Sequence, residues 1–135
     1  MDPTTQRQRL RDARVGRLAT IGPEGGPHLV PCCFVLVEDT IYSAVDAKPK
    51  STLALRRLAN LAANPAASLL VDHYDDEDWS ALWWIRVDGQ GRVTTSKTEH
   101  DQAITALQTK YAQYRRTPPP GPVIALRITR WRAWP

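Results

Sequence analysis

The sequence predicts one mainly β domain with flanking helices, built as a sandwich or a barrel. Short apolar runs alternate with turn signals rich in Gly, Pro and Asp, which is typical of strands joined by hairpins. Helical patterns are few and do not alternate with the strands, so a parallel α/β sheet is disfavoured. The 135 residues contain no internal repeat, and we expect residues 1–135 to form a single domain.

About seven short strands account for the apolar runs. Pro31 lies inside the second run, and because proline has no amide hydrogen this strand should be an edge, a bulge or a place where a ligand approaches the backbone. Asp88, Gly89 and Gly91 predict a hairpin turn between two later strands. The expected strands are Val15–Ile21, His28–Val37, Thr40–Val45, Ala66–His73, Leu82–Val87, Arg92–Thr95 and Val123–Trp134.

Helices are expected before the first strand, after the third strand and before the last strand. The first helix, residues 4–14, is polar and presents its arginines to solvent. The second helix ends before Pro65, which cannot continue it. The third helix, Thr98–Arg115, has an apolar stripe at helical spacing, and Thr98 with Asp101 resembles a capping box at its start.

The composition is that of a folded protein with free thiols. Five Trp and a hydrophobic fraction of 42% argue against a disordered chain. No apolar run approaches the roughly 20 residues that cross a bilayer, and no apolar signal core is present, so we expect a cytoplasmic protein with no membrane partner. Cys32 and Cys33 are adjacent on a strand and should point to opposite faces, so neither a disulfide nor a metal pair is expected.

Basic residues gather around the start of the second helix. Two lysines lie where the third strand leads into this helix, hydroxyl residues follow that can cap it, and two arginines lie one turn further in. A helix N-terminus favours anions through its dipole and its free amides. The pattern predicts a phosphate site, with a solvated helix start as the alternative. The residues of this site are Lys48, Lys50, Ser51, Thr52, Arg56 and Arg57.

Closely spaced tryptophans form a second candidate site. Strand alternation places Trp84 and Arg86 on one face of their strand and Trp83 on the other. Together with Trp79 these rings are too many for one small core, so at least one should face a partner subunit or a flat ligand. No standard catalytic motif or metal-ligand spacing is present, and His73 is better explained by pairing with a nearby carboxylate than by a metal.

Several motifs resemble those of a known family. They are the segment D-x-K-P-K-S-T, the N-P that follows the next helix, and the block V-D-H-Y-D-x-x-D-W-S-x-L-W-W. In this order they resemble the pyridoxamine 5'-phosphate oxidase-like superfamily of FMN-binding split β-barrels. More narrowly, the chain resembles the branch of deazaflavin-dependent (coenzyme F420-dependent) oxidoreductases of actinobacterial type. The resemblance covers about residues 8–134.

The resemblance implies a homodimer of six-stranded split β-barrels with two cofactor sites at the dimer interface. The basic cluster at the second helix would hold the cofactor phosphate, and the backbone of the second strand would lie along the flat ring system. Residues near the tryptophans would come from the neighbouring subunit. The implied cofactor-binding residues are Pro31, Cys32, Cys33, Lys48, Lys50, Ser51, Thr52, Arg56, Arg57, Trp79, Trp84 and Arg86.

The implied activity is F420-dependent reduction, with hydride transfer between the deazaflavin and a flat, electron-poor small molecule. One alternative is an enzyme of pyridoxamine-phosphate-oxidase type that uses FMN, and another is a carrier that binds F420 or a flavin without turnover. A nucleic-acid binder is disfavoured, because the net charge of +4 is modest and an acidic run at residues 75–78 lies beside the tryptophans. No residue is assigned a catalytic role from the sequence.

Overall fold

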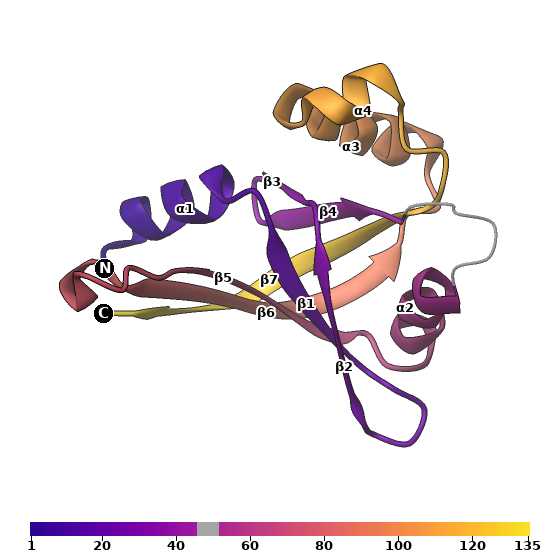
Figure 1. Ribbon diagram of the computed structural model, residues 1–135. Coiled ribbons are helices and arrows are strands. Elements are labelled where there is room, and N and C mark those ends of the chain that lie inside the picture. Colours follow the sequence, from indigo (N-terminus) through magenta and orange to yellow (C-terminus); the bar gives the residue numbers. More distant parts are fainter. Residues whose placement is uncertain (46–51) are drawn as a thin grey trace.

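The computed structural model describes residues 1–45 and 52–135, in which one curved sheet is flanked by helices (Figure 1). The predicted mainly β class is therefore confirmed. The strands are β1 (Gly16–Ile21), β2 (Pro27–Cys32), β3 (Val35–Val37), β4 (Thr40–Ala44), β5 (Ala66–His73), β6 (Trp83–Val93) and β7 (Val123–Trp134). The helices are α1 (Pro3–Asp12), α2 (Thr52–Ala63), α3 (Lys97–Lys110) and α4 (Ala112–Arg116), with a short 3-10 turn, η1 (Trp79–Ala81).

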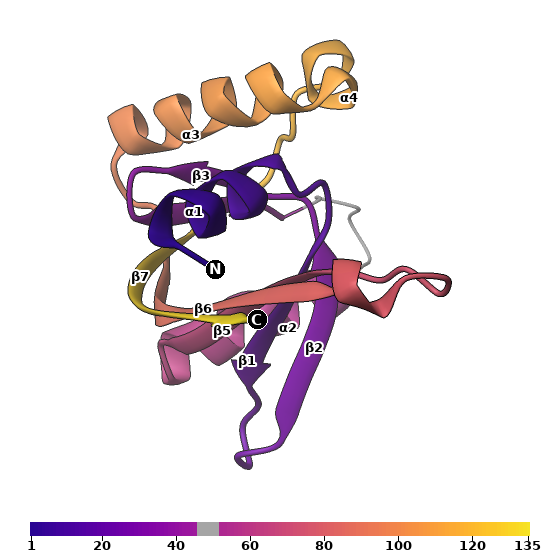
Figure 2. The same ribbon diagram turned by 90° about the vertical axis from the view of Figure 1, so that its left-hand side faces the viewer.

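The sheet curls so that its two edge strands meet. The strand order is β2-β1-β5-β6-β7-β4-β3, and every neighbouring pair is antiparallel. The edge strands β2 and β3 are separated in the chain only by Cys33 and Phe34, so the sheet must bend until its edges lie close together, as in a split barrel. Figure 2 shows β3 on the opposite side of the barrel from β5 and β6, with β1 and β2 along one flank. We call residues 31–34 the barrel seam.

The described residues form seven strands, whereas the resemblance implied six. The difference lies in the predicted strand His28–Val37, which is divided into β2 and β3. Each part pairs with a different neighbour, β2 with β1 and β3 with β4. If β2 and β3 are counted as one bent strand that forms both edges of the sheet, the sheet has the six strands that the resemblance implied.

The hydrophobic core fills the barrel and is closed at both ends by helices. Phe34, Leu69 and Ile85 are fully buried inside it. Leu10 of α1 and Leu61 of α2 belong to the same cluster, and Figure 1 shows these helices at opposite ends of the sheet. Because each end is covered by an apolar side chain, the helices seal the core from water.

One predicted feature, the hairpin at Asp88–Gly91, is wrong. β6 runs unbroken from Trp83 to Val93 and pairs with β5 and β7, with a β-bulge at Asp88/Gly89. A Cβ atom on Gly89 would lie 2.0 Å from the carbonyl oxygen of Arg127, and one on Gly91 would lie 2.7 Å from Cδ2 of Leu61. These glycines therefore permit close packing against β7 and α2, which the sequence does not distinguish from a turn.

The helix starts differ in part from expectation. α1 is capped by Asp2, whose carboxylate accepts a hydrogen bond from the amide of Thr5 at 2.8 Å. α3 begins at Lys97 and is capped by Ser96, so the capping box predicted at Thr98 is placed two residues too late. α2 ends at Ala63, before Pro65, as predicted. In the part of the chain that the structure describes, no helix is long and apolar enough to cross a membrane.

Candidate functional site

A cavity of about 260 Å³ opens at the barrel seam. It joins residues of the second strand to α2, which follows β4 in the chain. The structure thus brings together four of the predicted cofactor-binding residues. The cavity is lined by Val15, Pro31, Cys32, Cys33, Ala44, Arg57 and Tyr114.

Pro31 lies on an edge strand, as its missing amide hydrogen predicts. β2 pairs with β1 along one side, where Pro31 lies opposite Arg17, and no described strand pairs with its other side. Such an open strand edge can face a ligand without loss of a sheet hydrogen bond. The seam therefore offers accessible backbone at the position where the resemblance places a flat ring.

Arg57 is the member of the arginine pair that faces the cavity. Its side chain is half-buried and lines the cavity, whereas Arg56, one residue earlier on α2, is exposed. The Nε–H group of Arg57 is buried and has no hydrogen-bond partner among the described residues. A buried donor without an acceptor costs about 1–3 kcal/mol. An anionic ligand in this cavity would supply the acceptor.

Other residues of the predicted phosphate site cannot be placed. Lys48, Lys50 and Ser51 lie outside the described residues. Thr52 is the first residue of α2, and the structure describes its backbone only. Of the predicted phosphate site, the structure thus describes α2 and the arginines that it carries, of which Arg57 lines the cavity.

The two cysteines line the same cavity. Cys32 is the last residue of β2 and packs against the hydrophobic core, and both thiols are free. That the two side chains point to opposite faces stays a prediction. Burial raises the pKa of the Cys32 thiol, and a hydrogen bond with Ser43 opposes that shift. The Ser43 hydroxyl also donates to the carbonyl oxygen of Cys33 at 2.8 Å. Cys32 is thus a neutral thiol at neutral pH, which suits contact with an uncharged ring better than nucleophilic attack.

The end of α3 fixes the seam from outside, a feature that the sequence did not reveal. The Lys110 ammonium donates to the carbonyl oxygens of Ala13 (2.6 Å) and Phe34 (2.9 Å) and lies 4.0 Å from the Phe34 ring centre. The Tyr111 hydroxyl accepts from the Phe34 amide at 3.0 Å. Burial, with Arg14 nearby, lowers the pKa of Lys110 to about 8, and burial raises that of Tyr111 to about 12. Lys110 and Tyr111 thus hold the backbone of Phe34, the last residue of the seam.

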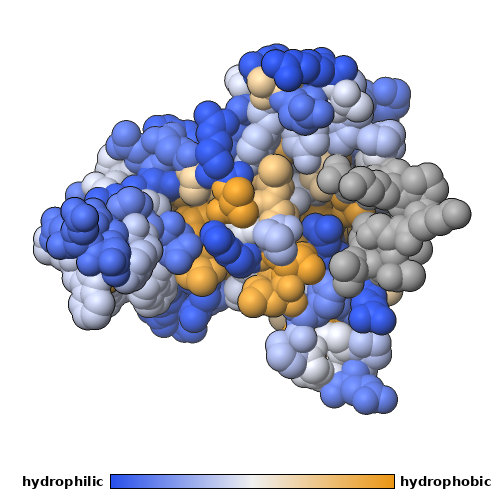
Figure 3. All heavy atoms as spheres, in the orientation of Figure 1, coloured by the Kyte–Doolittle hydropathy of each residue, from blue (hydrophilic) through white to orange (hydrophobic). Residues whose placement is uncertain are grey.

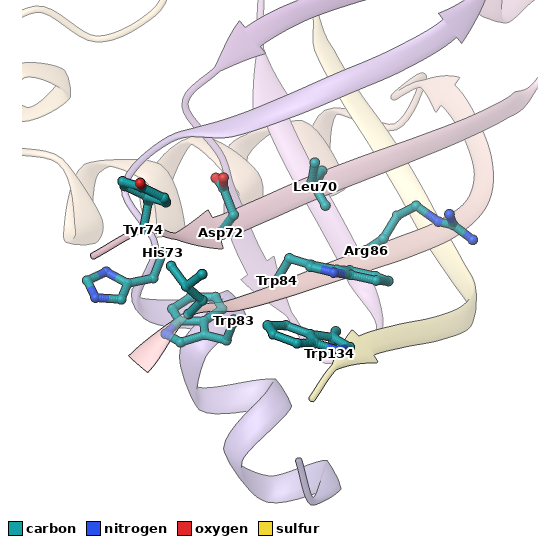
Figure 4. Close-up of a pocket in the computed structure, with 9 residues that line it drawn as sticks. Leu70, Asp72, His73, Tyr74, Trp83, Trp84, Arg86 and Trp134 are labelled. Atoms are coloured by element: carbon teal, nitrogen blue, oxygen red, sulfur yellow. The ribbon is translucent and has the colours of Figure 1, made fainter. Parts of the chain in front are cut away.

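A second cavity, of about 650 Å³, lies over the end of β5 and the start of β6 (Figure 4). Trp84 and Arg86 project into it from the outer face of β6, on the side predicted by strand alternation, while Ile85 and Val87 are buried in the core. Trp134 from the end of β7 lies beside Trp84. The residues lining this aromatic cavity are Leu70, Asp72, His73, Tyr74, Leu82, Trp83, Trp84, Arg86 and Trp134.

Within the single chain, the structure separates the predicted site into two parts. Pro31, Cys32, Cys33 and Arg57 line the seam cavity, and Trp84 and Arg86 line the aromatic cavity. Trp79 lies on η1, is 68% exposed and lines neither cavity. Trp134 joins the aromatic cavity through the pairing of β6 with β7, which no local sequence signal reveals.

Apolar side chains are exposed on the outer surface of the barrel near the seam. Leu29 on β2 is 66% exposed and Val15, which precedes β1, is 44% exposed. Figure 3 shows apolar side chains gathered over the β1 and β2 region, bordered by polar ones. Elsewhere, no group of three or more His, Cys, Asp or Glu side chains among the described residues could hold a metal ion.

These features define a class, the split β-barrel proteins, here with a cavity at the seam of the sheet. The family model for pyridoxamine 5'-phosphate oxidase matches residues 3–135 of the sequence, nearly its full length. The chain therefore belongs to the pyridoxamine 5'-phosphate oxidase family. No curated protein sequence matches it significantly.

Several solved structures share this fold. A conserved hypothetical protein from Mycobacterium tuberculosis is 20% identical, with a TM-score of 0.80, over 99% of this chain and 84% of the other. An FAD-binding protein from Mesorhizobium loti is 19% identical, with a TM-score of 0.74, over 98% and 94%. A heme binding protein from Mycobacterium smegmatis is 22% identical, with a TM-score of 0.76, over 96% and 52%. At these identities the likeness establishes the fold alone.

Proposed function

We propose that this protein is a homodimeric oxidoreductase that binds coenzyme F420 at the barrel seam and reduces a flat, electron-poor organic molecule. The observation that carries the proposal is the seam cavity, where the buried Nε–H of Arg57 has no acceptor among the described residues. FMN is the alternative cofactor, since a flavin shares the flat ring and the phosphate. The similar fold of an FAD-binding protein from Mesorhizobium loti supports a flavin-type group.

The residues of the cavity fit such a group in their chemistry. Arg57 offers a charged donor for a phosphate oxygen, and the N-terminal end of α2 adds free amides and a favourable dipole. The open edge at Pro31 and the neutral thiol of Cys32 offer an uncharged surface to a flat ring. The anion and the ring would thus be held by different sides of one cavity.

The size of the cavity supports a site completed by a second copy of the chain. Ligand pockets usually measure roughly 300–1,000 Å³, and the seam cavity measures about 260 Å³. One protomer would therefore cover only part of a flavin-sized molecule. The exposed apolar patch with Leu29 and Val15 is a suitable surface for the second copy. In the dimer, Trp84 and Arg86 would reach the cofactor of the partner subunit, as the resemblance implies.

The reaction would divide between cofactor and protein. A bound deazaflavin or flavin supplies the two-electron chemistry. The residues of the chain hold its phosphate, fix the orientation of its ring against the seam and, through the tryptophans, exclude water and stack on a flat substrate. The second candidate function is a carrier that binds the cofactor without turnover. A heme binding protein from Mycobacterium smegmatis has a similar fold, which supports this candidate.

Titration of the purified protein with F420 and with FMN, followed by quenching of tryptophan fluorescence, tests the proposal. We expect saturable binding of F420, weaker binding of FMN, and oxidation of reduced F420 on addition of a quinone. Binding without oxidation of the reduced cofactor by any quinone, enone or tetrapyrrole would support the carrier. Failure to bind either cofactor would contradict both.

A further inference from the structure

A third cavity, of about 530 Å³, lies along β3, the strand that forms one edge of the sheet. β3 contacts both α1 and α3 (Figure 2), and residues of all three elements line the cavity. We call it the β3 groove. None of its residues lines the seam cavity or the aromatic cavity. The groove is therefore a separate surface, to which the proposed reaction assigns no role.

The β3 groove contains an unpaired strand edge. β3 pairs with β4 on one side, and no described strand pairs with its other side. The amide and the carbonyl oxygen of Phe34, just before β3, point to that open side, where they bond to Tyr111 and Lys110. Because backbone groups alternate in direction along a strand, those of Leu36 point the same way. Leu36 lines the groove, so its amide and carbonyl group face this space.

The pairing of β4 gives the same result. The amide of Val45, just after β4, donates to the carbonyl oxygen of Pro122, just before β7, at 2.9 Å. Alternate residues of a strand bond to the same neighbour, so Ser43 and Ile41 also bond to β7. Leu36 lies opposite Ile41, and its own amide and carbonyl group therefore have no partner in β4. An added strand could pair with them.

The charges that border the groove are mostly positive. Arg14 donates to the carbonyl oxygen of Lys110 at 2.5 Å, and the Lys110 ammonium donates to two backbone carbonyl oxygens. Neither side chain forms an ion pair with a described residue. Arg11 pairs with its neighbour Asp12, the acidic residue of the groove, at 3.5 Å. Arg14 and Lys110 thus have no carboxylate partner, and an acidic ligand would complement them.

We propose that the β3 groove binds an extended acidic segment of another protein, which adds to β3 as a further strand and places a Glu or Asp side chain near Arg14 and Lys110. Leu36 supplies the main-chain hydrogen bonds of such an added strand. Val37 is 39% exposed and lines the groove, so it supplies an apolar contact. Because the arginine is exposed, salt should weaken the binding.

Hydrogen exchange of the labelled protein, followed by NMR, tests the added strand. The probe is a hexapeptide of alternating valine and glutamate, blocked at both ends, and the comparison peptide has glutamine in place of glutamate. The saturating glutamate peptide should slow exchange of the Leu36 amide. The amides of Val35 and Val37, which bond to β4, should change little. The glutamine peptide should bind more weakly.

Two arginine variants test the charge complementarity. Arg14→Gln should weaken binding of the glutamate peptide about 2- to 5-fold, the effect of losing an exposed ion pair, and leave the glutamine peptide unaffected. Arg115→Gln is the matched control, because Arg115 also donates to a carbonyl oxygen near the end of α3, that of Gln108 at 2.7 Å, but does not line the groove. It should bind both peptides like the wild type.

Several results would overturn the proposal. They are equal affinity of the wild type for the two peptides, equal loss in Arg14→Gln and Arg115→Gln, unchanged exchange of the Leu36 amide, and the absence of measurable binding. Sedimentation with the saturating glutamate peptide tests the other occupant, a second copy of the chain. A shift from dimer to monomer would assign the groove to that copy and overturn the proposal, whereas unchanged sedimentation would support it.

Discussion

Replacement of Arg57 by Met removes the one charged donor that the structure shows in the seam cavity while keeping the length of the side chain. The Nε–H of Arg57 is buried without an acceptor among the described residues. In the free protein this group is unfavourable by about 1–3 kcal/mol. Its removal should therefore leave the free energy of unfolding unchanged or raise it, and a gain of 1 kcal/mol corresponds to a rise in Tm of roughly 3–5 °C.

Cofactor binding should respond in the opposite direction. Loss of a charged hydrogen bond to a phosphate costs about 1.5–3 kcal/mol, or roughly 10- to 150-fold in Kd. Fluorescence titration of Arg57→Met with F420 and FMN measures this, and thermal unfolding measures the stability. Arg56→Met, on the same helix but exposed, is the control and should change neither. The reasoning is refuted if Arg57→Met binds the cofactor like the wild type, or if it loses stability while Arg56→Met does not.

Three further outcomes follow from the fold. Gly89→Ala should prevent folding or lower the unfolding free energy by more than about 3 kcal/mol in a denaturant titration, because its Cβ would lie 2.0 Å from the Arg127 carbonyl oxygen. Leu29→Glu should shift a dimer to monomers in sedimentation, because a charge enters an exposed apolar patch. Lys110, whose pKa is lowered from 10.5 to about 8, binds a proton more weakly in the native than in the unfolded chain. Between pH 8 and 10 the stability of the wild type should therefore rise relative to that of Lys110→Met, in which the opposing titration of Cys32 is still present.

Each of these three predictions would be contradicted by a specific result. Normal stability of Gly89→Ala would show that β6 and β7 do not approach as described. Leu29→Glu sedimenting as a dimer would remove β2 from the interface. A pH dependence that is the same in Lys110→Met and the wild type would show that the seam does not bury the ammonium. Above pH 10 tyrosines also titrate, so the comparison belongs below that value.

Local patterns in the sequence predict most of the fold. Alternation correctly placed Trp84 and Arg86 on the same face of β6, because a period of two depends only on neighbouring residues. Gly89 was misread because glycine serves both tight turns and close approach of two backbones. Only the partner strand distinguishes these uses, and it is distant in the sequence.

The sequence predicted less of the candidate site than of the fold. Arg57 could not be separated from Arg56 by spacing, because both lie near the start of one helix and only packing shows which is half-buried. Trp134 and Lys110 were missed, since each meets its partners through contacts between distant segments. Lys48, Lys50 and Ser51 lie outside the described residues, and their role stays a prediction.

A mixing experiment tests most directly whether the cofactor site is shared between two protomers. Arg57→Met disables the seam side of the proposed site, and Trp84→Ala disables the side contributed by the partner. If both variants bind cofactor poorly alone, equal mixing with exchange of subunits should restore binding in about a quarter of the sites, because half of the dimers are mixed and each has one intact site. Binding that stays at the level of the separate variants, despite subunit exchange shown by mass spectrometry, would contradict a shared site.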